Sequence, residues 1–284
     1  MLRYFLLSIC LLLSPLTFAT CNDDANTARL ENRIEESIEI LRVCLNEELS
    51  KVARTYLLMG LAQYEQGKHR NAIQDYTRAI ETAPDYVTAY VNRGLSNSMK
   101  GSYKQALADF DKALQLDPEY MQAYYFRAFA HEKKRKFDLA IKDYNRALLH
   151  VDETSELATI YHHRGLAYRG KGDNELAIAD YKQALQINPE YTNAYFSRGL
   201  LLQKDKQGEA AIADYSRAIE LQPDHAQALY NRGLLYRKAG SDHLAIRDYN
   251  KAIEIKPRYT RAHVNRSYAY LIPLLPLLFV LALG

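Results

Sequence analysis

The feature that most constrains this chain is a short phrase that returns every 34 residues. "AIADYKQAL" begins at Ala177, and "AIADYSRAI" begins at Ala211. The shared pattern is an Ala, an aromatic residue four positions later and a second Ala three positions after that. It opens at Ala72, Ala106, Ala140, Ala177, Ala211 and Ala245, and one interval of 37 residues departs from 34. A fixed period of this length predicts stacked copies of one supersecondary unit.

The spacing inside the phrase predicts a helix, because residues at i, i+4 and i+7 share one helical stripe. Its ring positions are Tyr76, Phe110, Tyr144, Tyr181, Tyr215 and Tyr249. A second helix is predicted upstream of each phrase. It carries a small residue at one internal position, namely Gly60, Gly94, Ala128, Gly165, Gly199 and Gly233. Because glycine inside a helix costs about 1 kcal/mol relative to alanine, its recurrence indicates close approach by the partner helix.

These positions resemble the tetratricopeptide repeat, a 34-residue helix–turn–helix unit. The resemblance covers six repeats and half of a seventh, at residues 53–86, 87–120, 121–157, 158–191, 192–225, 226–259 and 260–270. It implies an all-α fold, a right-handed α-solenoid, and a non-enzymatic scaffold that binds other proteins. Residues 21–52 are predicted to form an entry helix region before the first repeat.

Two charged residues recur with the repeat. An Asp precedes each ring, and an Arg precedes the small-residue position in every repeat except the first, which carries Met59. The final half repeat has the Arg and no Asp, so the count predicts pairing across each seam, with a planar guanidinium holding a carboxylate. The alternative is a set of solvated surface charges. The predicted pairs are Asp75–Arg93, Asp109–Arg127, Asp143–Arg164, Asp180–Arg198, Asp214–Arg232 and Asp248–Arg266.

A solenoid leaves an extended concave surface for ligands, and helix spacing selects the residues that line it. Positions two, five, nine and twelve of each first helix form a stripe beside the packed one. The alternative is that its rings only complete the packing between repeats. The candidate residues of a peptide-binding groove are Tyr125, His162, Phe196, Tyr230, Gln122, Asn193, Gln227, Arg169 and Arg237.

Charge and motif content argue against other function classes. The chain has 37 basic and 34 acidic residues with no long single-sign run, and this balance disfavours nucleic acid as a partner. No phosphate loop, nucleophile elbow, metal-ligand spacing or paired-carboxylate motif stands out, so we expect no cofactor, no metal, no small-molecule substrate and no enzymatic activity. Two hypotheses stay open besides the scaffold, or adaptor, that binds other proteins. In one the chain is a self-associating subunit of an envelope assembly, and in the other it is an enzyme with an unrecognised site.

Both ends of the chain are apolar. Residues 1–20 have one basic residue, Arg3, then an apolar run and small residues, which predicts an export signal. In the alternative, "FATC" is a lipoprotein box and Cys21 is lipidated. For residues 271–284 the interpretations are a membrane anchor, a cap on the last helix, a removable anchor signal and a change of reading frame. We therefore expect an exported protein of the cell envelope or periplasm, associated with the membrane through the tail or Cys21.

Overall fold

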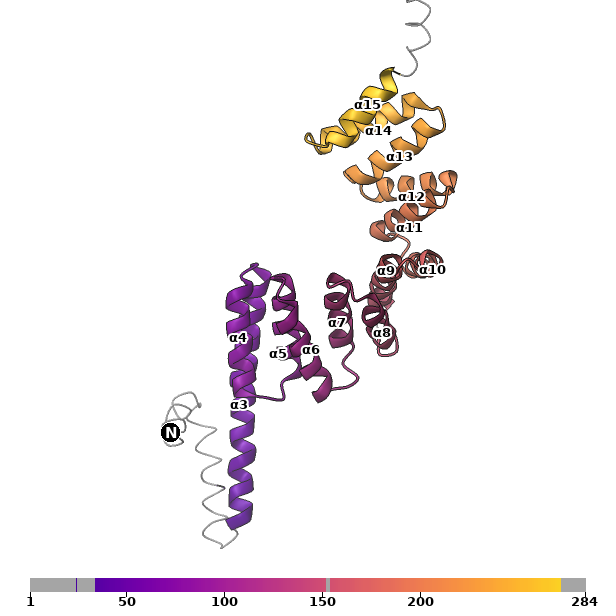
Figure 1. Cartoon of the computed structure of the whole chain (residues 1–284). Helices are drawn as coiled ribbons and strands as arrows, with labels where there is room; N and C mark the ends of the chain where they lie inside the picture. The colour runs from indigo at the N-terminus through magenta and orange to yellow at the C-terminus, as the bar shows by residue number, and fades with distance from the viewer. Residues whose placement is uncertain (1–23, 25–33, 152–153, 272–284) are drawn as a thin grey trace, which may run out of the picture. The chain divides into compact units, whose positions relative to one another are not determined.

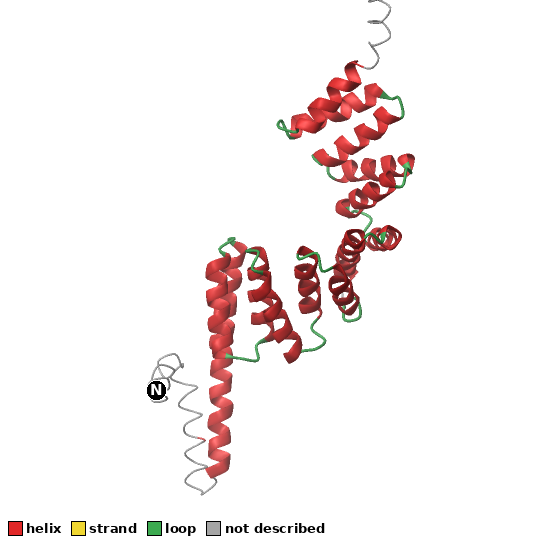
Figure 2. Cartoon of the chain, viewed as in Figure 1, coloured by secondary structure: helices red, strands yellow, loops and turns green. Residues whose placement is uncertain are grey.

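The computed structural model describes Asp24, residues 34–151 and residues 154–271. These residues form thirteen helices and no strand, so the all-α prediction is confirmed (Figure 2). The predicted export signal, Cys21, and the tail beyond Leu271 lie outside the described residues. The chain divides into two compact units, Met1–Ala130 and His131–Gly284.

The first unit is built on a long helix, α3 (Ile34–Glu65), which pairs with α4 (His69–Thr82) (Figure 1). The pair α5 (Val87–Met99) and α6 (Tyr103–Leu116) follows, and α7 (Met121–Lys133) closes the unit with its residues up to Ala130. The boundary predicted at residue 52 falls inside α3. The helix runs through it because no Gly or Pro interrupts residues 34–59.

The second unit begins in the last turn of α7 and continues with α8 (Phe137–Ala147) and α9 (Thr154–Lys171). α9 forms a pair with α10 (Asn174–Ile187). Two further pairs follow along the chain: α11 (Thr192–Lys204) with α12 (Gly208–Leu221), and α13 (Ala226–Lys238) with α14 (Asp242–Ile255). The last described helix is α15 (Thr260–Leu271). No helix in residues 34–151 or 154–271 is long and apolar enough to cross a membrane.

The helices follow the predicted repeat boundaries closely. α5, α7, α11, α13 and α15 each begin at the first residue of a predicted repeat. α9 begins at Thr154, four residues before the predicted start of repeat four, so part of the longer third interval is helical. The turns inside the helix pairs need a left-handed backbone residue, with φ of 71° at Gly67 and 104° at Gly172.

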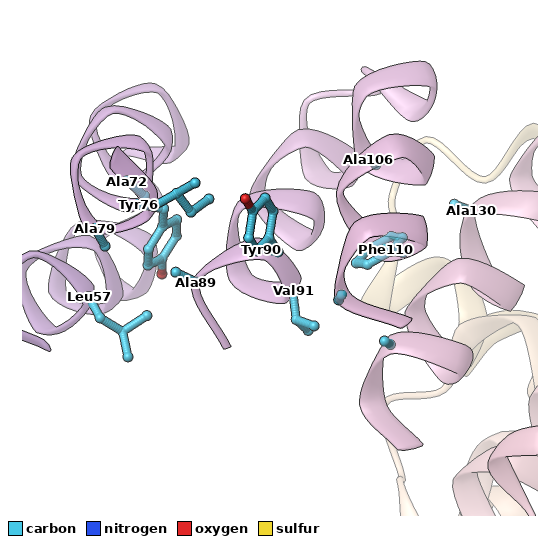
Figure 3. Close-up of a cluster of buried hydrophobic side chains, with 13 residues drawn as sticks. Leu57, Ala72, Tyr76, Ala79, Ala89, Tyr90, Val91, Ala106, Phe110 and Ala130 are labelled. Atoms are coloured by element: carbon cyan, nitrogen blue, oxygen red, sulfur yellow. The ribbon is translucent and has the colours of Figure 1, made fainter. Parts of the chain in front are cut away.

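The core of each helix pair is a ring packed against a glycine. Tyr76 and Phe110 are fully buried, and Figure 3 shows the Tyr76 ring with Ala72 and Ala79 of its own helix and the Phe110 ring with Ala106 of its own. A Cβ atom added at Gly94 would lie 2.6 Å from Cε1 of Phe110, and one added at Gly199 would lie 2.8 Å from Cε1 of Tyr215. The recurring glycine is therefore explained by the ring, which occupies the space that a side chain would need.

Two glycine substitutions are expected to act with opposite signs. Gly199→Ala should lower the free energy of unfolding by about 1–3 kcal/mol, because the added methyl overpacks the Tyr215 ring. Gly208→Ala should leave that free energy unchanged or raise it by up to about 1 kcal/mol, because the nearest atom to a Cβ there lies 3.9 Å away. Urea unfolding followed by circular dichroism measures both. Equal effects from the two variants would contradict the packing role of Gly199.

Candidate functional site

Four of the recurring arginines pair with the Asp of their own repeat. Nε of Arg198 donates to Oδ2 of Asp214 at 2.8 Å, and its Nη2 donates to Oδ1 at 2.6 Å. Both carboxylate oxygens are thus held by one guanidinium, and Asp214 is buried. The same two-pronged contact joins Arg93 to Asp109, Arg164 to Asp180 and Arg232 to Asp248.

The predicted pairing across the seam is therefore wrong for these four arginines. The reason lies in the register of the helix pair. The glycine that contacts the ring follows the Arg by one residue, and the ring follows the Asp by one residue. The contact that brings Gly199 onto Tyr215 thus also brings Arg198 beside Asp214, within one repeat.

The other recurring Asp and Arg residues have different partners. Asp75, whose repeat lacks the Arg, lies 3.4 Å from Nη1 of Arg78 on the same helix. Arg127, predicted to pair with Asp109, instead contacts Asp111, with 2.7 Å between Nη1 and Oδ1. Arg266, predicted to pair with Asp248, donates to Oδ1 of Asn250 at 2.7 Å. Asp143 is buried.

The arginines nevertheless cross the seam, through their third nitrogen. Nη1 of Arg232 donates to Oγ of Ser216 at 3.0 Å, and this acceptor lies two residues after the Asp of the preceding repeat. A single Arg thus joins the two helices of its own repeat and also holds the repeat before it. At four other seams, Nη1 of the recurring Arg donates to the residue at this same position, which is Thr77, Asp111, Asn145 or Asn250.

The seam between repeats four and five lacks this acceptor, because Lys182 occupies the position. Lys182→Asn is expected to supply it to Nη1 of Arg198, as Asn250 does for Arg266. The free energy of unfolding should rise by about 0.5–1.5 kcal/mol, the net worth of one hydrogen bond. Urea unfolding measures the change, and Lys182→Ala, which removes the lysine side chain beyond Cβ without supplying an acceptor, is the control. If Lys182→Ala stabilises as much as Lys182→Asn, the gain does not come from the new acceptor.

Two of the predicted groove rings are buried. His162 is 5 % exposed, and its Nε2 and Nδ1 lie 3.1 Å from Oγ of Ser197 and 3.3 Å from the Tyr191 hydroxyl. Burial, with the charges of His163 and Arg169 nearby, lowers the pKa of His162 to about 3. His162 is therefore a neutral packing residue that joins repeat four to repeat five.

Tyr230 has the equivalent role two seams later, between repeat six and the final half repeat. Its ring is buried against Tyr249 and Tyr259, with ring centroids 6.0 and 5.0 Å away, and its hydroxyl accepts from Nδ2 of Asn265 at 3.1 Å. These contacts favour the alternative in which the rings complete the packing between repeats.

The other two predicted rings are half-buried. The Phe196 ring centroid lies 6.0 Å from that of Tyr215 and 4.7 Å from that of His225. Tyr125 lies edge-on to Phe126 at 5.2 Å between centroids. Each ring therefore keeps some exposed surface while it packs against its neighbours.

Two of the five polar candidates are exposed. Asn193 and Gln227, at position two of their helices, are exposed. Gln122 is half-buried, as are Arg169 and Arg237 at position twelve. Within residues 34–151 and 154–271, neither of these two arginines has a carboxylate partner.

In the second unit these residues belong to a set of helix positions here called the first-helix face. It consists of repeat positions two, five, six, nine, twelve and thirteen, counted from Ala158 on α9, Thr192 on α11 and Ala226 on α13, and of positions two, five, six, nine and twelve, counted from Thr260 on α15. On each helix these positions fall within one stripe about 120° wide. Successive stripes touch where His162 meets Ser197 and where Tyr230 meets Asn265. The surface includes a row of half-buried leucines outside the predicted set, Leu166, Leu200 and Leu234.

This surface offers apolar contact along the leucine row and hydrogen bonding by side-chain amides, which both donate and accept. Amides of this kind can pair with the backbone of a bound segment. Among the described residues, no group of three His, Cys, Asp or Glu is placed to hold a metal ion. The side chain of Cys44 lies outside the described set.

Sequence models of the tetratricopeptide repeat match most of the helical region. Matches cover residues 57–118, 100–156, 165–206, 205–240 and 226–259. No curated protein matches the sequence.

Solved tetratricopeptide structures share the fold. YrrB, described as "a TPR protein with an unusual peptide-binding site", is 26% identical with a TM-score of 0.54, and the match covers 68% of this chain and 97% of that chain. PilF of Pseudomonas aeruginosa is 15% identical with a TM-score of 0.68, covering 78% and 99%. PilW, a type IV pilus biogenesis factor, is also 15% identical with a TM-score of 0.68, covering 75% and 97%. The chain therefore belongs to the tetratricopeptide repeat family, whose members bind other proteins.

Proposed function

We propose that this chain is a non-enzymatic adaptor of the cell envelope that binds segments of other proteins on the first-helix face. The observation that carries the proposal is the combination, on this face, of exposed amides with a half-buried leucine row. Asn193 and Leu200 lie on the same side of α11, two helical turns apart, as do Gln227 and Leu234 on α13. The resemblance to YrrB, whose description names a peptide-binding site, supports the binding of a peptide segment. The envelope location rests on the export signal predicted at residues 1–20.

The test is affinity capture from a detergent-solubilised envelope extract with the full chain as bait. The variant Asn193→Ala/Gln227→Ala removes two exposed amides from the face and leaves the buried rings in place. Gln183→Ala/Gln186→Ala removes two exposed amides from the second helix α10 and is the matched control. Clients retained by the wild type and by the control, but depleted about tenfold by the first variant, support the proposal. Equal capture by all three proteins would place binding elsewhere on the chain.

Self-association is a second candidate function, and the last helix favours it. α15 exposes four large apolar side chains by about half of their surface, Val264, Tyr268, Tyr270 and Leu271. Exposed apolar groups that lie together favour association. Size-exclusion chromatography with light scattering tests this by comparing the molar mass of the full chain with that of the variant Val264→Ser/Tyr268→Ser. A concentration-dependent dimer that the variant abolishes would support self-association, and a monomer at all concentrations would exclude it.

A further inference from the structure

Charge is distributed unequally between the two kinds of helix in the second unit. The second helices α10, α12 and α14 carry eight carboxylates and four basic residues. The first helices α9, α11 and α13, with α15, carry a single carboxylate, Glu156. Their ten basic residues are Arg164, Arg169, Lys171, Arg198, Lys204, Arg232, Arg237, Lys238, Arg261 and Arg266.

Part of this positive charge is neutralised inside the fold. Arg164, Arg198 and Arg232 hold the buried Asp of their own repeats. Lys171 lies 3.1 Å from Asp138 and 3.4 Å from Asp173. These four residues therefore contribute little to the potential outside the molecule.

Five basic residues keep their charge on the first-helix face. Arg169 and Arg237 stand at position twelve, Lys204 and Lys238 at position thirteen, and Arg261 at position two. None of them has a carboxylate within 4.0 Å among the described residues. No carboxylate occurs at any stripe position of the four helices. The face is thus positive along its length, although the whole chain is nearly neutral.

Favourable interaction with the helix dipole explains only part of this arrangement. Four of the five residues lie near the carboxyl end of a helix, where the dipole favours cations. Arg261 lies in the first turn of α15, where the dipole disfavours a cation. The dipole also gives no reason for the lack of carboxylates along the middle of each stripe. A ligand of opposite charge accounts for both observations.

We propose that the first-helix face of residues 154–271 binds an acidic protein segment whose carboxylates alternate with apolar side chains. The carboxylates meet the five unpaired cations, and the apolar side chains lie on Leu166, Leu200 and Leu234. The inference rests on the proposed function and adds the chemistry of the client. The leucine row favours a protein over a nucleic acid, because a duplex backbone offers it no apolar surface.

Fluorescence anisotropy with the full chain in mild detergent tests the proposal. The probe is a short fluorescein-labelled peptide in which Glu alternates with Leu, beside counterparts with Gln or Lys in place of Glu. Arg169→Gln/Arg237→Gln removes two cations from the face. Arg217→Gln/Lys251→Gln removes two cations from the second helices α12 and α14 and changes the net charge equally. Circular dichroism confirms that both variants stay helical.

The Glu peptide is expected to bind at least about tenfold more tightly than the Gln peptide, and the Lys peptide to bind weakest. Arg169→Gln/Arg237→Gln should weaken binding of the Glu peptide about tenfold, while the control variant binds like the wild type. Raising the salt concentration from about 0.05 M to about 0.3 M should reduce the preference for Glu, because exposed charges are screened.

Other outcomes separate this inference from the proposed function. If the Glu and Gln peptides bind equally and Asn193→Ala/Gln227→Ala weakens both, the face binds protein segments without charge selection, and only the acidic client is overturned. If a duplex oligonucleotide displaces the Glu peptide and binds more tightly, the ligand is a nucleic acid. In a third outcome, no peptide binds, but the capture experiment still yields clients that Asn193→Ala/Gln227→Ala loses. The proposal of an acidic client is then overturned, and the proposed adaptor function stands.

Discussion

Replacing Phe110 with alanine is expected to lower the free energy of unfolding by about 3–5 kcal/mol. The Phe110 ring is fully buried, lies against the backbone of Gly94, and stacks on Phe126 with 6.3 Å between centroids. Its removal leaves a cavity between α5 and α6, and rigid helices cannot close it. Urea unfolding measures the loss. Hydrogen exchange should show the added opening in α5 and α6 first, because a repeat contacts only its neighbours.

Phe110→Tyr is the matched control, since tyrosine occupies the equivalent position in the other five repeats. In repeat five the Tyr215 hydroxyl donates to Oε1 of Gln203, twelve residues earlier, at 2.7 Å. The residue twelve before Phe110 is Ser98, whose buried hydroxyl has no hydrogen-bond partner among the residues that the structure describes. The new hydroxyl should therefore find an acceptor, and the free energy of unfolding should change by less than about 1 kcal/mol. A loss as large as that of Phe110→Ala would contradict the packing account.

Asp214→Ala is expected to cost about 3–5 kcal/mol of unfolding free energy, because it leaves the Arg198 guanidinium largely buried without its counter-charge. The Arg198 side chain is 21% exposed and the Asp214 side chain 6%. The hydrogen bonds that Arg198 donates to Asp214 outweigh the opposing effect of burial and raise the pKa of Arg198. An Arg guanidinium cannot be deprotonated in a protein, so it stays charged when the carboxylate is removed.

A double-mutant cycle separates the ion pair from lost packing. Arg198→Ala/Asp214→Ala should be less destabilised than the sum of the single variants, since no charge is stranded. Asp111→Ala is the exposed control. It removes a 2.7 Å contact with Arg127, but the Asp111 side chain is 56% exposed, so the cost should be about 0–1 kcal/mol. Additive effects in the cycle would show that the pair is not coupled.

Periodicity in the sequence was sufficient for the repeat, the helix pairs and most helix starts. The Ala–aromatic–Ala spacing and the recurring glycine each report a short-range packing requirement, and such requirements act through neighbouring turns of one helix. The sequence was also sufficient to predict the correct Arg–Asp pairing. The step of one residue from Arg198 to Gly199, and from Asp214 to Tyr215, is visible in the sequence and sets the register of the hairpin.

The sequence by itself determined which residues recur, and hence the fold class and the positions of rings, glycines and charges. Only the tertiary structure decided which of those residues are accessible. His162 and Asn193 both belong to the predicted groove, yet one fills a seam and the other lies in solvent. Their exposure depends on how the next repeat packs against the helix, as when Ser197 and Tyr191 enclose His162. Such contacts lie about 30 residues apart in the chain, and a local pattern does not specify them.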